Sequence, residues 1–165
     1  MICTKKRLWL CCSLLAVNLA FIWGNSLLPG EISGAISGWL RDLFAALIPG
    51  GEDKPDTGHG LLRKLAHFTE FCTLGMLFSW LYGMLLKKPW QHLAFPLLCG
   101  VAAACLDETI QRFVPGRGPG IKDVGIDTLG VTLGIVILYF ISKKTNAKYL
   151  EEQTLLKSLW HCCWL

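Results

Sequence analysis

The sequence predicts an all-α membrane protein with about four transmembrane helices and one interfacial amphipathic helix. Apolar residues make up 53% of the 165 residues and charged residues only 17%, whereas soluble domains carry roughly a quarter charged residues. The apolar residues gather in four stretches, at about 8–23, 65–86, 91–106 and 124–142. Each approaches the roughly 20 residues that cross a bilayer core. Because lipid offers no hydrogen-bond partners to the backbone, these stretches should be helices.

The first stretch follows Lys5, Lys6 and Arg7, an arrangement that also occurs in signal peptides. A cleaved signal peptide is therefore the alternative interpretation. Residues 25–29, Asn-Ser-Leu-Leu-Pro, offer no clear small-x-small cleavage site. We expect a retained first transmembrane helix.

The segment between the first two stretches divides into two parts. Residues 31–48 place apolar side chains such as Ile32, Ile36, Trp39 and Leu43 at helical spacing. Residues 49–60 are rich in Pro, Gly and Asp, which indicates a loop. We expect an amphipathic helix on the membrane surface in this first outer loop.

Basic residues predict the orientation in the cell membrane. They cluster at 5–7, 87–88 and 143–148, positions that four spans would bring to one side. Because basic clusters favour the cytoplasmic side, we expect a multi-pass protein with both termini in the cytoplasm. Residues 1–142 would form the transmembrane domain and 143–165 a cytoplasmic polar tail, with a short helix at about 149–160.

Composition also argues against two other classes of protein. The net charge of +4 is modest and no basic stripe appears, so nucleic acid is not an expected partner. Most of the eight cysteines lie in apolar runs and none forms a CxxC pair, which argues against a disulfide framework or a zinc knuckle. Lipidation of Cys162 or Cys163 stays open.

Ionisable residues gather at the predicted outer ends of three helices, although they are far apart in the sequence. Charged groups facing lipid are strongly disfavoured, and inside membranes such residues usually serve function. An ion-pair network that only clamps the helices is the alternative. The residues of the predicted cluster are Lys64, His67, Glu70, Asp107, Glu108, Gln111, Arg117, Asp123 and Asp127.

These residues fall in motifs that resemble the VanZ-like family of membrane proteins. The motifs are Asn25-Ser26, Lys64-x-x-His67, Asp107-Glu108-x-x-Gln111, Pro115-Gly116-Arg117 and Asp123-x-x-x-Asp127-x-x-Gly130. The resemblance covers about residues 10–142. It implies a role near that of the family's namesake, which gives low-level resistance to the glycopeptide teicoplanin. Teicoplanin targets the lipid-linked wall precursor at the outer face of the bacterial membrane.

Two functional hypotheses follow, and the sequence leaves enzymatic activity undecided. In the first, an outer-leaflet polar pocket binds a lipid headgroup or an amphiphilic glycopeptide, with Lys64, Gln111, Arg117, Asp123 and Asp127 as binding residues. This activity would serve glycopeptide resistance or cell-envelope homeostasis.

In the second hypothesis, the protein is an intramembrane enzyme that modifies a lipid-linked wall precursor. His67, Glu70, Asp107 and Glu108 are then the candidates for acid and base catalysis. Mg²⁺ is an optional cofactor, with Glu108, Asp123 and Asp127 as its candidate ligands.

Overall fold

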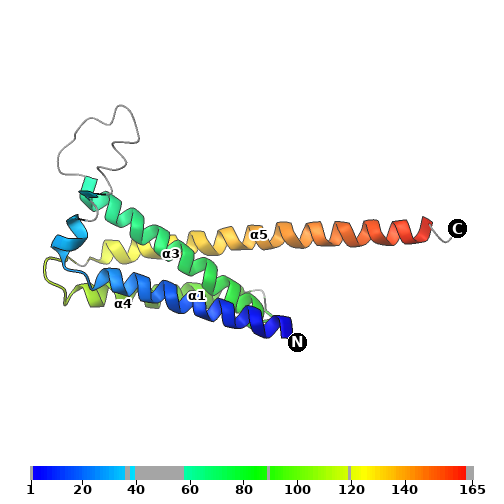
Figure 1. The fold of residues 1–165 in the computed structure, drawn as a ribbon, viewed down its shortest axis with the longest axis horizontal. Helices are drawn as coiled ribbons and strands as arrows, with labels where there is room; N and C mark the ends of the chain where they lie inside the picture. Colours follow the sequence, from blue (N-terminus) through cyan, green and yellow to red (C-terminus); the bar gives the residue numbers. More distant parts are fainter. Residues whose placement is uncertain (1, 36–37, 40–57, 89, 119, 163–165) are drawn as a thin grey trace, which may run out of the picture.

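Four helices make up most of the part of the chain that the structure describes. This computed structural model describes residues 2–35, 38–39, 58–88, 90–118 and 120–162. The helices are α1 (Ile2–Ser26), α3 (Gly58–Leu85), α4 (Gln91–Gln111) and α5 (Ile121–Cys162). Consecutive helices run in opposite directions (Figure 1). The end of α1, the start of α3, the end of α4 and the start of α5 therefore meet at one end of the bundle, here called the site end.

Three of the helices are long and apolar enough to cross a membrane. These segments are Lys5–Ser26, Gln91–Gln111 and Ile121–Lys144. Large apolar side chains also point away from the protein interior, including Trp9, Val17, Phe21, Leu98 and Phe140. An outward apolar surface on long helices fits a lipid environment. The regular secondary structure of the described residues is thus entirely helical, as predicted, and three long apolar helices are compatible with a multi-pass membrane protein.

The predicted surface helix at 31–48 lies mostly outside the described residues. Residues 30–35 and 38–39 are helical. The predicted loop at 49–60 falls almost entirely on residues that the structure does not describe.

The helices extend beyond the predicted apolar stretches. Both α1 and α4 continue into their polar flanks. Residues 149–160 are helical as predicted, but they do not form a short helix of their own, because α5 runs without a break from Ile121 to Cys162. At 1.5 Å per residue, its 42 residues span about 63 Å. The bilayer core is only about 30 Å thick, so α5 is longer than a membrane span requires.

The core of the bundle centres on the contact between α3 and α5. Phe71, Leu74 and Val131 are fully buried there. A Cβ atom added at Gly134 would overlap the backbone of Cys72, and one at Gly130 would lie 2.5 Å from the carbonyl oxygen of Phe68. The two glycines therefore let the backbones of α3 and α5 approach closely, as small residues do in membrane helix pairs.

Candidate functional site

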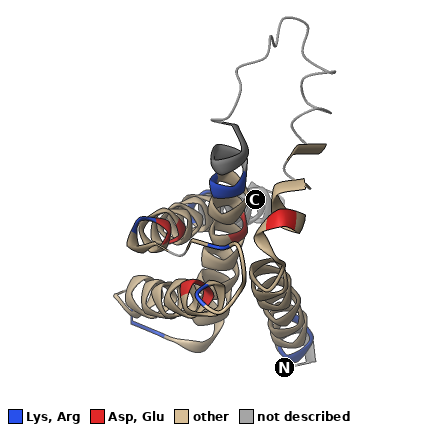
Figure 2. Ribbon diagram, turned by 90° about the vertical axis from the view of Figure 1, so that its left-hand side faces the viewer, with Lys and Arg blue, Asp and Glu red and all other residues tan. Residues whose placement is uncertain are grey.

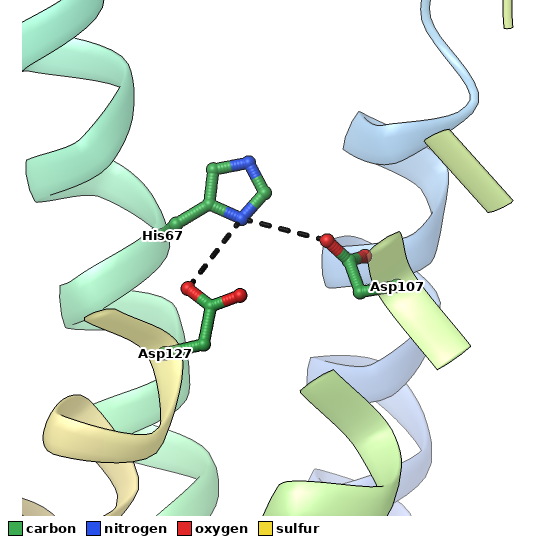
Figure 3. Close-up of side chains that lie close together, drawn as sticks. All are labelled: His67, Asp107 and Asp127. Carbon is green, nitrogen blue, oxygen red and sulfur yellow. Dashed lines mark ion pairs between the residues drawn. The ribbon is translucent and has the colours of Figure 1, made fainter. Parts of the chain in front are cut away.

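Three side chains from three different helices meet at the site end. His67 comes from α3, Asp107 from α4 and Asp127 from α5 (Figure 3). Nδ1 of His67 lies 3.6 Å from Oδ2 of Asp107 and 3.9 Å from Oδ1 of Asp127. These three residues are called the buried trio below.

Both carboxylates of the trio are withdrawn from solvent. The exposed fraction is 0% for Asp107 and 1% for Asp127. Among the described residues, neither oxygen of Asp127 has a hydrogen-bond partner, and Oδ1 of Asp107 also lacks one. Buried polar atoms in folded proteins are almost always paired. Three unpaired carboxylate oxygens around one histidine therefore mark an unusual place in this fold.

Gln111 fixes the orientation of the Asp107 carboxylate. Its Nε2 donates to Oδ2 of Asp107 at 2.8 Å, one helical turn away, and is also 3.2 Å from Oγ of Ser26 at the end of α1. Gln111 and Ser26 are both buried. The contact ties the end of α1 to the wall of the site.

A small polar pocket opens beside the trio. Its interior volume is about 10 Å³, which is room for about one water molecule or ion. Figure 2 looks at this end of the bundle, where acidic and basic positions lie on the ends of separate helices. The pocket is lined by Arg63, Lys64, His67, Glu108, Gln111, Asp123, Ile126 and Asp127.

Glu108 and Glu70 have partners outside the trio. Oε2 of Glu108 accepts a hydrogen bond of 2.8 Å from the backbone N–H of Gly120. Oε1 of Glu70 accepts one of 2.9 Å from Nδ2 of Asn25, on α1. Glu108 thus lies at the pocket wall, whereas Glu70 links α3 to α1.

Arg117 ties the loop after α4 to the end of α1. Its Nε donates to the carbonyl of Leu28 at 3.0 Å, and its Nη2 donates to the carbonyl of Asn25 at 2.6 Å. Burial, the largest effect, and the nearby charge of Arg63 lower the pKa of the Arg117 guanidinium from its usual value. Because two of its nitrogens donate hydrogen bonds to backbone carbonyls, Arg117 has a structural role in joining the two segments.

The loop itself closely approaches the segment that follows α1. Gly116 has a φ of +72°, which glycine adopts without steric penalty. The N–H of Gly30 donates to the carbonyl of Pro115 at 3.1 Å. The Pro115-Gly116-Arg117 motif therefore closes the bundle at the site end.

The structure brings most of the predicted cluster together. His67, Asp107, Gln111 and Asp127 form the centre, while Lys64, Glu108 and Asp123 line the same pocket. Glu70 and Arg117 lie against α1 instead. The predicted roles of these residues in catalysis and binding stay predictions.

Sequence reasoning gave no role to three groups that the structure places here. Asn25 and Ser26 bond to members of the cluster, and the backbone N–H of Gly120 holds Glu108. The Asn25-Ser26 motif was the available signal, since two polar residues end an otherwise apolar helix. A backbone donor leaves no signal in the sequence.

The residues best placed to hold a metal ion differ from the predicted set. One ligand atom from each of His67, Asp107 and Asp127 lies within 4.8 Å of the other two. Among the described residues, neither Glu108 nor Asp123 belongs to this group. Asp127 is common to both sets.

Antiparallel apolar helices that enclose buried ionisable residues are compatible with a multi-pass helical membrane protein that carries a polar site at one end of the bundle. The profile of the VanZ/LLP1 family matches residues 9–142. The chain therefore belongs to the VanZ/LLP1 family. No curated protein and no solved structure matches it.

Proposed function

We propose that the chain crosses the cell membrane four times, with α3 as the additional span and the site end at the outer face. The 28 residues of α3 are enough to cross, and its antiparallel course between α1 and α4 supports a span. Basic residues at 5–7, 87–88 and 143–144 lie away from the site end. Basic clusters favour the cytoplasm, so both termini are cytoplasmic in this proposal.

The pocket, we further propose, binds the phosphate-bearing headgroup of a membrane lipid, such as a lipid-linked wall precursor. The observation that carries this proposal is that two basic residues, Arg63 and Lys64, line the pocket beside the buried trio. Guanidinium and ammonium groups form strong charge-assisted hydrogen bonds with phosphate oxygens. Because the interior has room for about one water molecule, the headgroup would cover the opening and direct one polar group inward.

If the pocket lies at the membrane surface, a lipid headgroup can enter it while the lipid stays in the bilayer. The site end lies where three helices long enough to cross a membrane begin or end, so the pocket would lie level with lipid headgroups. An amphiphilic glycopeptide could contact the same rim, but it is too large for the interior. Binding at the outer face would serve cell-envelope homeostasis or low-level glycopeptide resistance.

The test measures lipid affinity in nanodiscs. The double variant Arg63→Gln/Lys64→Gln should bind a polyprenyl phosphate at least about tenfold more weakly, because each charge-assisted bond contributes about 1.5–3 kcal/mol. The matched control is Lys87→Gln/Lys88→Gln, two exposed lysines at the other end of the bundle. Equal affinities for both double variants would contradict the proposal, and teicoplanin in a parallel titration tests the second ligand.

A second candidate function is hydrolysis of the bound lipid. The observation in its favour is the imidazole of His67 beside a pocket that has room for a water molecule. A positioned histidine is the commonest general base in enzymes. Release of phosphate from a lipid-linked precursor by the wild type, and its loss in His67→Gln, would establish the activity. Lipid binding without phosphate release by the wild type would rule it out.

A further inference from the structure

The buried trio has the composition of a metal site. One imidazole nitrogen and two carboxylates converge from α3, α4 and α5, with the three ligand atoms within 4.8 Å of one another. Catalytic zinc sites use three protein ligands of this kind and leave a further position open. In this fold two of the three residues, His67 and Asp127, line the adjoining pocket.

The separations between the trio atoms suit ligands of a common ion better than hydrogen bonds. Nδ1 of His67 is 3.6 Å and 3.9 Å from the two carboxylates, beyond a good hydrogen bond. For metal–ligand distances of about 2.0–2.1 Å, two ligands of a tetrahedral ion lie about 3.3–3.4 Å apart. The two histidine–carboxylate distances are close to that value, and all three ligand atoms lie within 4.8 Å of one another, so a bound ion would draw the ligands together.

Unpaired buried atoms supply an independent observation that points to a ligand. Asp127 is 99% buried, and among the described residues neither of its carboxylate oxygens has a hydrogen-bond partner. Oδ1 of Asp107 is likewise buried and has no hydrogen-bond partner there. Within the described part of the chain, His67 alone makes ion pairs with these carboxylates, and no Lys or Arg does. A divalent cation would neutralise the two like charges and satisfy the free oxygens.

The neighbours of the trio resemble the outer partners that orient the ligands of known metal sites. Nε2 of Gln111 donates to the Asp107 carboxylate, and the second nitrogen of the His67 ring points away from both aspartates (Figure 3). Partners that orient ligand carboxylates are a regular feature of metal centres. The trio therefore has both inward ligand atoms and an outer orienting contact.

We propose that His67, Asp107 and Asp127 bind one divalent first-row transition-metal ion, with Zn²⁺ as the expected ion. The imidazole disfavours Mg²⁺, which prefers oxygen ligands and retains its water shell. The fourth position faces the pocket, where the ion would meet the phosphate of a lipid held by Arg63 and Lys64. This role rests on the proposed function, whereas metal binding itself is measured without lipid.

The experiment uses the full-length protein, purified in detergent and stripped with EDTA. Equilibrium dialysis against Zn²⁺ followed by elemental analysis should give a stoichiometric metal content. Asp107→Asn, Asp127→Asn and His67→Gln should each lose the bound metal, while Glu31→Gln and His92→Gln retain it. Glu31 is exposed, and Nε2 of His92 bonds the carbonyl of Leu86 at the other end of the bundle, so both are matched controls.

A second measurement does not depend on any variant folding. Co²⁺ added to the wild type should give the visible spectrum of nitrogen and oxygen ligation. A thiolate charge-transfer band would place the metal at cysteines and overturn the inference, as would a wild type without metal or trio variants that keep it. Lipid titrations with and without Zn²⁺ separate the two proposals, since metal binding without lipid binding would refute only the lipid function.

Discussion

At the residue scale, Gln111 acts on the site through Asp107. Its amide holds one Asp107 oxygen and also contacts Ser26, so it positions the carboxylate. We predict that Gln111→Leu weakens Zn²⁺ binding about 10–100-fold, the usual effect of removing an outer partner of a metal ligand. Competition with a fluorescent chelator measures this affinity. Gln111→Glu, which loses the amide that donates to Asp107 and Ser26 and adds a further carboxylate beside Asp107, should not restore it.

Asn25 provides a residue-scale test that concerns stability. Its amide is the hydrogen-bond partner of Glu70, whose second oxygen is buried without one. Replacing Asn25 by Ala leaves both oxygens unpaired, which should lower the free energy of unfolding by about 1–3 kcal/mol. Thermal unfolding in detergent measures the loss. Ser13→Ala, at an exposed position on the same helix, is the control, and an equal effect there would contradict the assignment.

The sequence predicted which residues share a depth, but not which atoms meet. Lys64, His67 and Glu70 occur three residues apart, so one face of a helix was predictable. Asp107 and Glu108 are neighbours in sequence, however, and both are buried. Only the rotation of α4 against α3 decides that Asp107 faces His67 while Glu108 reaches the N–H of Gly120.

At the element scale, the crossing of α3 and α5 depends on Gly134. A side chain there would overlap the backbone of Cys72, and an overfilled core commonly costs about 1–3 kcal/mol. We predict that Gly134→Ala lowers the melting temperature in detergent by several degrees. Gly125→Ala is the matched control, because nothing lies within 4 Å of its added Cβ. A melting temperature for Gly134→Ala at or above that of Gly125→Ala would refute this prediction.

Helix ends illustrate what local sequence can and cannot specify. The apolar stretches gave the positions of the membrane segments because a run of apolar residues has few alternatives in lipid. The polar residues after Ser142 suggested a break, yet residues 143–162 contain neither proline nor glycine. Without a residue that terminates a helix, α5 continues to Cys162.

At the scale of the whole molecule, the proposed orientation is testable with cysteine labelling. In a cysteine-free background, Glu31→Cys should react with an impermeant reagent on intact cells, and Lys88→Cys only after permeabilisation. Both positions are exposed, and they lie toward opposite ends of the bundle. The basic clusters motivate this direction. The reverse labelling pattern would move the pocket to the cytoplasmic face and remove the outer-leaflet ligands from consideration.

The central claim is that the buried trio serves a ligand and does not hold the fold together. Two carboxylates face one histidine, and within the described part of the chain the Asp127 carboxylate has no hydrogen-bond partner. Removing one of two like charges should therefore not weaken the ligand-free protein. A residue kept for function often costs stability.

Thermal unfolding of the wild type and Asp127→Asn, both in EDTA, tests the claim most directly. The account predicts that Asp127→Asn melts at the same temperature as the wild type or higher, and that Zn²⁺ raises the melting temperature of the wild type alone. A variant that melts several degrees lower in EDTA would show that the carboxylate clamps the helices, which would contradict the account.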